Sequence, residues 1–262
     1  MNGARIDPDD TNALLAWLRA EYEHPFVGWD FAHLASRRVD DPMPWDYAAL
    51  VTERLPGSRS LLDMGTGGGE FLSALRPLPP HTCATEGYAP NVPIARARLE
   101  PLGIAVAEVG DDGRLPYADG AFDLVINRHE YYEPGEVWRV LRPGGHFITQ
   151  QVGGDDDREL NALLRAPNPT HEYGFWNLDY ARPPLETTGF CITLAEEAHI
   201  PARFTDVGAI VFYLKITPWQ IPDFAIDRYL EPLRALHRQC QQDGAIVVHS
   251  HRFIIAAEKP AN

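Results

Sequence analysis

A glycine-rich turn between two apolar stretches constrains the fold of this chain more than any other feature. Residues 60–72 read Ser-Leu-Leu-Asp-Met-Gly-Thr-Gly-Gly-Gly-Glu-Phe-Leu. An apolar run that ends in an acidic residue predicts a buried strand, and the glycines predict a tight loop that opens a helix. Because glycine lacks a side chain, the backbone of such a loop can approach a ligand closely. The pattern therefore predicts a ligand-binding strand–loop–helix unit of an α/β fold.

The acidic residue of this unit separates two classes of ligand. In the dinucleotide fingerprint G-x-G-x-x-G, a third glycine would stand at the position of Glu70. Asp63, at the end of the strand, would repel a pyrophosphate but suits a ligand that carries an ammonium and a sulfonium group. The stretch resembles motif I (D/E-x-G-x-G-x-G) of the class I S-adenosylmethionine (SAM) methyltransferases, matched here by Asp63, Gly65, Gly67 and Gly69.

A second acid follows at the spacing that a nucleotide-binding unit requires. A short strand over 82–85 is predicted to end at Glu86, which lies 23 residues beyond Asp63. Nucleotide-binding α/β units place an acid at about this spacing, where it accepts hydrogen bonds from the ribose hydroxyls. A third strand over 105–109 is followed by Asp111 and Asp112, and the resemblance implies that one of these acids contacts the adenine amino group.

Two further motifs strengthen the resemblance to the methyltransferases. Residues 115–126 read LPYADGAFDLVI, and residues 139–145 read RVLRPGG, with a predicted helix over 133–141 between the two strands. Both segments are similar to signatures of the family and follow in the family's order. The resemblance is closest to the type-11, ubiquinone-biosynthesis-like branch of the superfamily.

This resemblance implies both the fold and the cofactor. The expected fold class is α/β, with a Rossmann-like, seven-stranded, mostly parallel sheet whose last strands cover about 190–199 and 252–258. The implied cofactor is SAM, with S-adenosylhomocysteine as product and no metal. The residues implied to bind the cofactor are Asp63, Gly65, Thr66, Gly67, Gly69, Glu86, Gly87, Asp111, Asp112 and Asn127.

The chain is expected to divide near residue 50. Residues 1–50 are expected to form an N-terminal lid of helical and aromatic segments, and residues 51–262 the methyltransferase domain. Within that domain, 51–152 is the expected SAM-binding half and 153–262 the expected substrate-side half. Helices predicted over about 206–216 and 226–242 form an insertion near the C-terminus, where apolar residues recur at helical spacing.

Candidate catalytic chemistry lies at the end of the fourth predicted strand. In open α/β sheets, ligands bind beyond the carboxyl ends of the strands, and His129 directly follows that strand. A histidine there is a candidate general base, because its ordinary pKa is suited to removing a proton from an acceptor hydroxyl. It also has other possible roles: it can orient the loop or bind the SAM carboxylate, and many methyltransferases act by proximity alone.

Several polar and aromatic side chains are candidates for binding the methyl acceptor. Six aromatic residues stand between Tyr22 and Tyr47, a density that favours a wall over an apolar substrate, although packing alone would also explain it. The candidates for this role are Tyr22, Trp29, Tyr47, Tyr131, Gln150 and Gln151.

Composition argues against several other functions. The formal net charge is −14, and no Lys/Arg-rich run occurs, so the chain is poorly suited to grip a phosphate backbone. The three cysteines stand apart, and His249-x-His251 has no evident third metal ligand, so no metal site is expected. With no signal peptide and no membrane-spanning apolar run, a cytoplasmic location is expected; monomer and homodimer both remain open.

Together these features predict a SAM-dependent methyltransferase (EC 2.1.1.-). The expected acceptor is a small, partly apolar metabolite that is methylated on oxygen, nitrogen or carbon. One alternative is a ribosomal RNA or transfer RNA methyltransferase, against which the net charge argues. The other is a non-catalytic SAM-binding interaction protein that keeps the fold.

Overall fold

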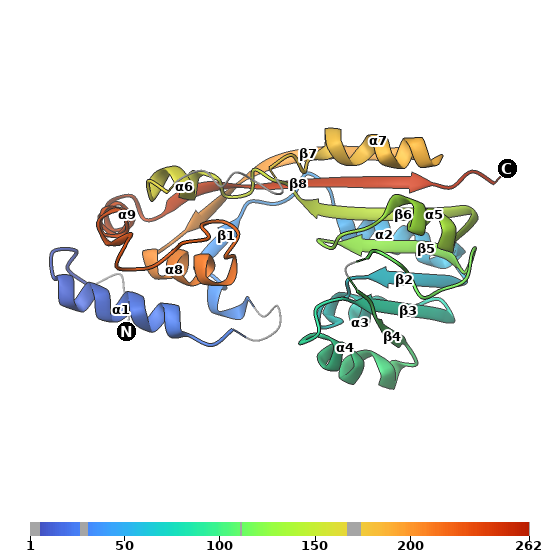
Figure 1. Cartoon of the computed structure of the whole chain (residues 1–262), viewed down its shortest axis with the longest axis horizontal. Coiled ribbons are helices and arrows are strands. Elements are labelled where there is room, and N and C mark those ends of the chain that lie inside the picture. The colour runs from blue at the N-terminus through green and yellow to red at the C-terminus, as the bar shows by residue number, and fades with distance from the viewer. Residues whose placement is uncertain (1–5, 27–30, 111, 167–173, 262) are drawn as a thin grey trace. The chain divides into compact units, whose positions relative to one another are not determined.

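The computed structural model describes residues 6–26, 31–110, 112–166 and 174–261, which form two compact units (Figure 1). The first unit combines Met1–Met43, Gly154–Phe175 and His199–His251. The second unit combines Pro44–Gly153, Trp176–Ala198 and Arg252–Asn262. Each unit therefore draws on segments that lie far apart in the sequence, and the N-terminal segment shares a unit with residues from the C-terminal half.

The strands confirm the α/β class and the mostly parallel sheet. Hydrogen-bonded neighbours follow the order β1-β7-β8-β6-β5-β2-β3-β4. Pairing is parallel for β2 with β3 and β5, for β3 with β4 and for β5 with β6, whereas β6 and β8 are antiparallel. The strand bounds are β1 Arg38–Asp40, β2 Ser60–Met64, β3 His81–Glu86, β4 Ala105–Glu108, β5 Phe122–Arg128, β6 Leu141–Val152, β7 Cys191–Phe204 and β8 Ile246–Glu258.

The predicted number of seven strands is wrong by one. The described residues form eight, because Arg38–Asp40 pairs antiparallel with the far end of β7, at Ala202–Phe204. The strands β7 and β8 are also longer than predicted, and both extend from the second unit into the first. The extension of β8 carries the polar residues of 249–251, and that of β7 carries Pro201 and Arg203, which interrupt the pattern that identifies a strand.

In the second unit, helices cover both faces of the parallel strands. Successive strand residues point to opposite faces, so Leu61 and Leu124 join one core, whereas Leu62 and Val125 join another. The first of these cores is covered by α2 (Tyr47–Arg54), α3 (Glu70–Ala74) and α4 (Val92–Leu99), and the second by α5 (Pro134–Val140) and α7 (Leu178–Thr188). The carboxyl ends of β2, β3 and β5 therefore lie between two helical layers.

The first unit has a hydrophobic core of its own. Its helices are α1 (Thr11–Glu23), α6 (Glu159–Leu163), α8 (Val207–Ile216) and α9 (Leu230–Asp243). The side chain of Asp206 caps α8 by accepting a 2.8 Å hydrogen bond from the Ala209 amide, as its position before an apolar run favours. Nearly every residue of α8 is buried, and α1 packs against it through Leu14, Trp17 and Leu18. Among the described helices, none combines the length and apolarity that a membrane crossing needs.

Candidate functional site

The glycine loop after β2 adopts the conformation that its sequence predicts. Gly65 and Gly67 have φ values of 66° and 62°, in the left-handed region that favours glycine. A Cβ atom on Gly65 would lie 2.4 Å from Cβ of Glu130, so no other residue fits there, whereas Gly67 borders open space. The amide of Thr66 donates a 2.9 Å hydrogen bond to the Thr85 carbonyl, which ties the loop to the end of β3.

Glu86, at the end of β3, is bound directly to this loop. Its buried carboxylate accepts hydrogen bonds from the amide of Gly67 at 2.6 Å and from the amide of Tyr88 at 2.7 Å. Burial raises the pKa of Glu86, although these amides oppose the shift. The exposed Gly87 follows, with Val109 beside it. The structure therefore brings together the two segments that the spacing of Asp63 and Glu86 predicts to share a ligand.

Asp63, the first acid, is buried at the end of β2. Its Oδ2 accepts a 2.7 Å hydrogen bond from the Thr66 hydroxyl. Burial raises the pKa of Asp63 to about 7, the negative charge of Glu86 adds to the rise, and the Thr66 hydrogen bond and Arg128 oppose it. Two buried carboxyl groups thus lie at the ends of adjacent strands, an arrangement that a positive charge between them would stabilise.

Asn127, at the end of β5, lies at the centre of a buried polar group. Its Oδ1 accepts hydrogen bonds from the Thr149 hydroxyl at 2.8 Å and from Gln151 Nε2 at 2.6 Å. Its backbone carbonyl accepts a 3.2 Å hydrogen bond from the Tyr47 hydroxyl. The side-chain Nδ2 is buried and has no hydrogen-bond partner among the described residues. A buried donor without a partner costs free energy, which a ligand acceptor would recover.

His129 directly follows β5, in the strained left-handed region with φ of 64°. Its amide donates a 2.8 Å hydrogen bond to the Gln150 carbonyl, and its Nε2 lies 3.2 Å from Gln150 Nε2. Trp45 Nε1 can only donate, and it lies 2.8 Å from the Gln150 Oε1. The Gln150 amide therefore donates to His129 Nε2, which leaves the His129 proton on Nδ1. Desolvation by the surrounding protein, then the positive charges of Arg252 and Arg128, lower the pKa of His129.

The other predicted acceptor-binding residues occupy different environments. Gln151 is buried, and its Nε2 donates to Asn127 and to the Glu130 carbonyl. Tyr131 is exposed, and its hydroxyl donates a 3.0 Å hydrogen bond to Glu133. Tyr22 belongs to the first unit and packs on its core, whereas Tyr47 is buried in the second unit.

Two acids were predicted to follow the third parallel strand. Asp112 is exposed and caps a turn by accepting a 3.1 Å hydrogen bond from the Arg114 amide. Asp111 and the aromatic candidate Trp29 lie outside the described residues.

The prediction from sequence missed two residues that lie beside the glycine loop after β2. Arg128 places its guanidinium 4.9 Å from the centre of the Phe71 ring, and its charge acts on Asp63. Glu130 packs its side chain directly on Gly65. Arg128 is the last residue of β5 and Glu130 follows it by two positions, so the argument that singled out His129 also applied to them.

Among the described residues of the first unit, one group of side chains resembles a metal site. Side-chain atoms of Asp155, His199 and His251 all lie within 4.8 Å of one another. However, the two imidazole rings stack at 4.2 Å with 19° between their planes, so both lone pairs cannot point at one ion. The Asp155 amide also lies 3.2 Å from His251 Nδ1. His249, in turn, pairs with Glu159 at 2.7 Å.

Comparison with known proteins identifies the segment that contains most of this site. The family model of the type-11 methyltransferase domain matches residues 62–149. Residues 62–149 are a class I methyltransferase domain of type 11. The cofactor of this family is SAM, and Asp63, Glu86 and Asn127 all lie within the methyltransferase domain.

Curated relatives share the same region of the chain. The demethylmenaquinone methyltransferase of Deinococcus radiodurans is 32% identical over 131 residues, which are 46% of this chain and 54% of that protein. The protein-L-isoaspartate O-methyltransferase of Cellvibrio japonicus is 30% identical over 132 residues, which are 48% of this chain and 58% of that protein. The chain therefore spans about half the length of the curated relatives that it matches.

The fold extends beyond the methyltransferase domain. The solved structure of a Bacillus halodurans protein superposes with a TM-score of 0.58 at 20% identity, over 82% of this chain and 99% of that chain. At this identity, the likeness concerns the fold alone.

Proposed function

We propose that this protein is a SAM-dependent methyltransferase that acts on a small, partly apolar acceptor. The observation that carries the proposal is the pair of buried acids, Asp63 and Glu86, on either side of the glycine loop. Neither acid has an ion-pair partner among the described salt bridges, so a cationic ligand would supply the missing charge.

The described residues fit SAM in three respects. The loop at Gly67 borders open space, where a Cβ would meet no atom within 4 Å. Each carboxylate retains lone pairs beyond the hydrogen bonds that it accepts within the protein. The buried Nδ2 of Asn127 has no protein partner. We assign the ribose to Glu86, and the methionine portion to Asp63 and Asn127. We assign the adenine to Asp111 or, in its place, to Asp112.

SAM supplies a methyl group on a positively charged sulfur, which an electron pair of the acceptor displaces. The task of the protein is to orient the acceptor, exclude water and accommodate the proton that an O–H or N–H acceptor loses. His129 is the residue that we assign to the acceptor. Because Gln150 holds its Nε2, the imidazole presents Nδ1–H, which orients an acceptor oxygen by donating to it. General-base action at Nε2 requires that His129 first release Gln150.

Two observations support the proposed class of acceptor: the net charge of this chain and the name of one relative. The net charge of −14 disfavours RNA, and the domain carries no feature that favours the RNA alternative. The Deinococcus relative is named for demethylmenaquinone, an apolar ring-containing molecule, and we extend that class to this chain.

A screen for methylated products tests the function. The full chain is incubated with SAM and a cell metabolite extract, and mass spectrometry searches for molecules that gain one methylene unit. The matched control replaces SAM with S-adenosylhomocysteine, which has no methyl group to give. Binding of SAM without any methylated product would favour the non-catalytic alternative, and preferential binding of NAD would contradict the proposal altogether.

A further inference from the structure

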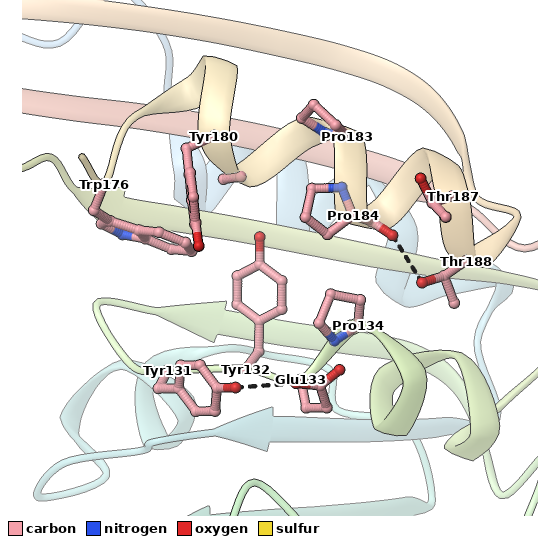
Figure 2. Close-up of a pocket in the computed structure, with 11 residues that line it drawn as sticks. Tyr131, Tyr132, Glu133, Pro134, Trp176, Tyr180, Pro183, Pro184, Thr187 and Thr188 are labelled. Carbon is pink, nitrogen blue, oxygen red and sulfur yellow. Dashed lines mark hydrogen bonds between the residues drawn. The ribbon is translucent and has the colours of Figure 1, made fainter.

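The second unit contains a groove beside the segment that follows β5. The groove has a volume of about 510 Å³ and lies between α7 and residues 131–134 (Figure 2). We name it the α7 groove. Its volume is within the range of small-molecule sites. Its lining includes three prolines and four aromatic side chains, namely Tyr131, Tyr132, Trp176 and Tyr180.

One polar atom at the floor of the groove has no partner. Tyr132 is 3% exposed, and its ring packs on Phe147 at 5.0 Å. Its hydroxyl has no hydrogen-bond partner among the described residues, and it points up towards α7 in Figure 2. A buried hydroxyl is normally paired, so an unpaired one that faces a groove indicates a ligand acceptor. The neighbouring Tyr131 differs, because its hydroxyl already donates to Glu133.

The chemistry of the walls narrows the class of ligand. The rings of Trp176 and Tyr180 lie 6.0 Å apart at one end of the groove, and Trp176 lies 6.2 Å from Tyr132. Aromatic and proline surfaces favour a flat apolar ring. None of the described lining residues is Arg, Lys or His, so a phosphate or carboxylate would find no positive charge there.

A short segment connects this groove to the glycine loop after β2. Glu130 packs on Gly65, and the next two residues line the groove. A Cβ on Gly113 would lie 3.2 Å from the Tyr131 ring, so that ring also contacts the loop after β4. A molecule in the groove would therefore touch the same segment that borders the cofactor.

We propose that the α7 groove binds the ring of the methyl acceptor, and that Tyr132 donates a hydrogen bond to an oxygen on that ring. This inference rests on the proposed methyltransferase function and adds the chemical class of the acceptor: a flat, apolar ring that carries a carbonyl or hydroxyl oxygen. Tyr132 then distinguishes oxygenated rings from hydrocarbon rings, because only the former recover the cost of its unpaired hydroxyl.

The test compares two probes that differ only in their oxygens. These are 2,3-dimethyl-1,4-naphthoquinone, whose ring positions are blocked against thiol addition, and 2,3-dimethylnaphthalene. Equilibrium dialysis measures the dissociation constant of each probe for the full chain with S-adenosylhomocysteine present. We expect Tyr132→Phe to weaken quinone binding by about threefold to tenfold and to leave hydrocarbon binding unchanged, as loss of one hydrogen bond implies. Tyr229→Phe is the matched control, because its hydroxyl bonds Asp223 in the first unit, and it should change neither constant.

A second variant tests the wall rather than the hydrogen bond. Trp176→Ala should weaken the binding of both probes by a similar factor, because it removes an apolar contact with the ring. Failure of the quinone to bind, equal quinone affinity for the wild type and Tyr132→Phe, or an unchanged affinity in Trp176→Ala would each overturn the groove assignment. The affinity for S-adenosylhomocysteine is measured in parallel by calorimetry: its absence would overturn the methyltransferase function itself, whereas intact affinity with a negative probe result would overturn the groove alone.

Discussion

Trp45 and Gln150 meet in a hydrogen bond of 2.8 Å, from the indole Nε1 to the amide Oε1. Because an indole nitrogen can only donate, this contact decides which atom of the Gln150 amide faces His129. The amide nitrogen faces the imidazole at 3.2 Å, so the lone pair of His129 Nε2 is engaged by a donor. A residue before α2 thus sets the tautomer of a histidine that follows β5.

This chain of contacts makes a prediction for His129. We expect His129→Ala to lower kcat by roughly 10²-fold, with the affinity for SAM within twofold of the wild type. Because the pKa of His129 is lowered, its imidazole stays neutral at pH 6–8, and kcat should show no acid limb in that range. Stopped assays measure kcat and its dependence on pH, and calorimetry measures the affinity for SAM. An acid limb near pH 6–7 that vanishes in His129→Ala would instead establish a general base with an ordinary pKa.

Trp45→Phe is the companion variant, since it keeps an aromatic ring but removes the donor. Gln150 can then rotate its amide, and we expect a smaller decrease in kcat, about threefold to tenfold, with the same SAM affinity. A decrease as large as that of His129→Ala would show that Trp45 contacts the acceptor itself.

The raised pKa of Asp63 predicts how cofactor affinity changes with pH. Its pKa of about 7 means that the folded protein without ligand holds a proton on Asp63 up to near neutral pH. A positively charged ligand favours the ionised form, so SAM affinity should rise between pH 6 and pH 8 and binding should release a proton. Calorimetry in buffers of different ionisation enthalpy measures that release. In Asp63→Asn, affinity should be weaker and independent of pH over this range, and a wild-type affinity that is flat from pH 6 to pH 8 would contradict the assignment.

The same shift predicts a change in stability. The pKa of Asp63 is raised on folding, so the folded chain binds more protons than the unfolded chain between pH 4 and pH 7. The contribution of Asp63 to stability is therefore fully present below pH 4 and is lost as the pH rises through about 7. Asp63→Asn should remove this dependence, which urea unfolding at several pH values can detect. If the free energies of unfolding of the wild type and of Asp63→Asn changed with pH in parallel, the pKa of Asp63 would not be raised on folding.

Glu86 provides a direct test of the cofactor site. Glu86→Ala should weaken S-adenosylhomocysteine binding by about 1–3 kcal/mol, because it removes a buried acceptor. Glu108, which pairs with Glu86 in register on β4, is exposed, so Glu108→Ala is the matched control and should bind normally. Calorimetry without added metal measures both variants. Equal affinities for the two would place the ribose elsewhere.

The packing of α1 on α8 predicts a stability defect in the first unit. A Cβ on Gly208 would lie 2.6 Å from Trp17 Cζ2 and 2.8 Å from Glu21 Cγ. Gly208→Ala should therefore lower the free energy of unfolding by about 1–3 kcal/mol, despite the better helix propensity of alanine. Gly57→Ala, where a Cβ meets no atom within 4 Å, should change it by less than about 0.5 kcal/mol. Urea titration followed by tryptophan fluorescence measures both, and equal midpoints would refute the close packing.

Local sequence patterns were sufficient to predict the fold of the SAM-binding half. The order of strand, acid and glycine loop at 60–69 is a local signal, and so is the second acid at Glu86. The structure confirms that these segments form adjacent parallel strands, because carboxyl ends of parallel strands meet at one edge of a sheet. The helices α8 and α9 were also predictable, since their apolar residues recur with helical spacing.

Other features depended on partners that are distant in sequence. The strand β1 exists because Arg38–Asp40 finds an edge of β7 more than 160 residues later, and a three-residue strand has no pattern of its own. The final strand was predicted over 252–258, yet β8 begins at Ile246 and includes His249, because neighbouring strands satisfy its backbone.

The sequence by itself determined the class of fold and the cofactor, because both depend on residue types within about 90 consecutive positions. Only the tertiary structure decided the environment of each candidate. Two neighbouring residues, Gln150 and Gln151, project to opposite faces of β6, so one binds His129 and the other binds Asn127. Tyr131 and Tyr132 are likewise adjacent, yet one hydroxyl is paired at the surface and the other is unpaired beneath α7. Burial and hydrogen bonding arise from long-range packing, and no local pattern encodes them.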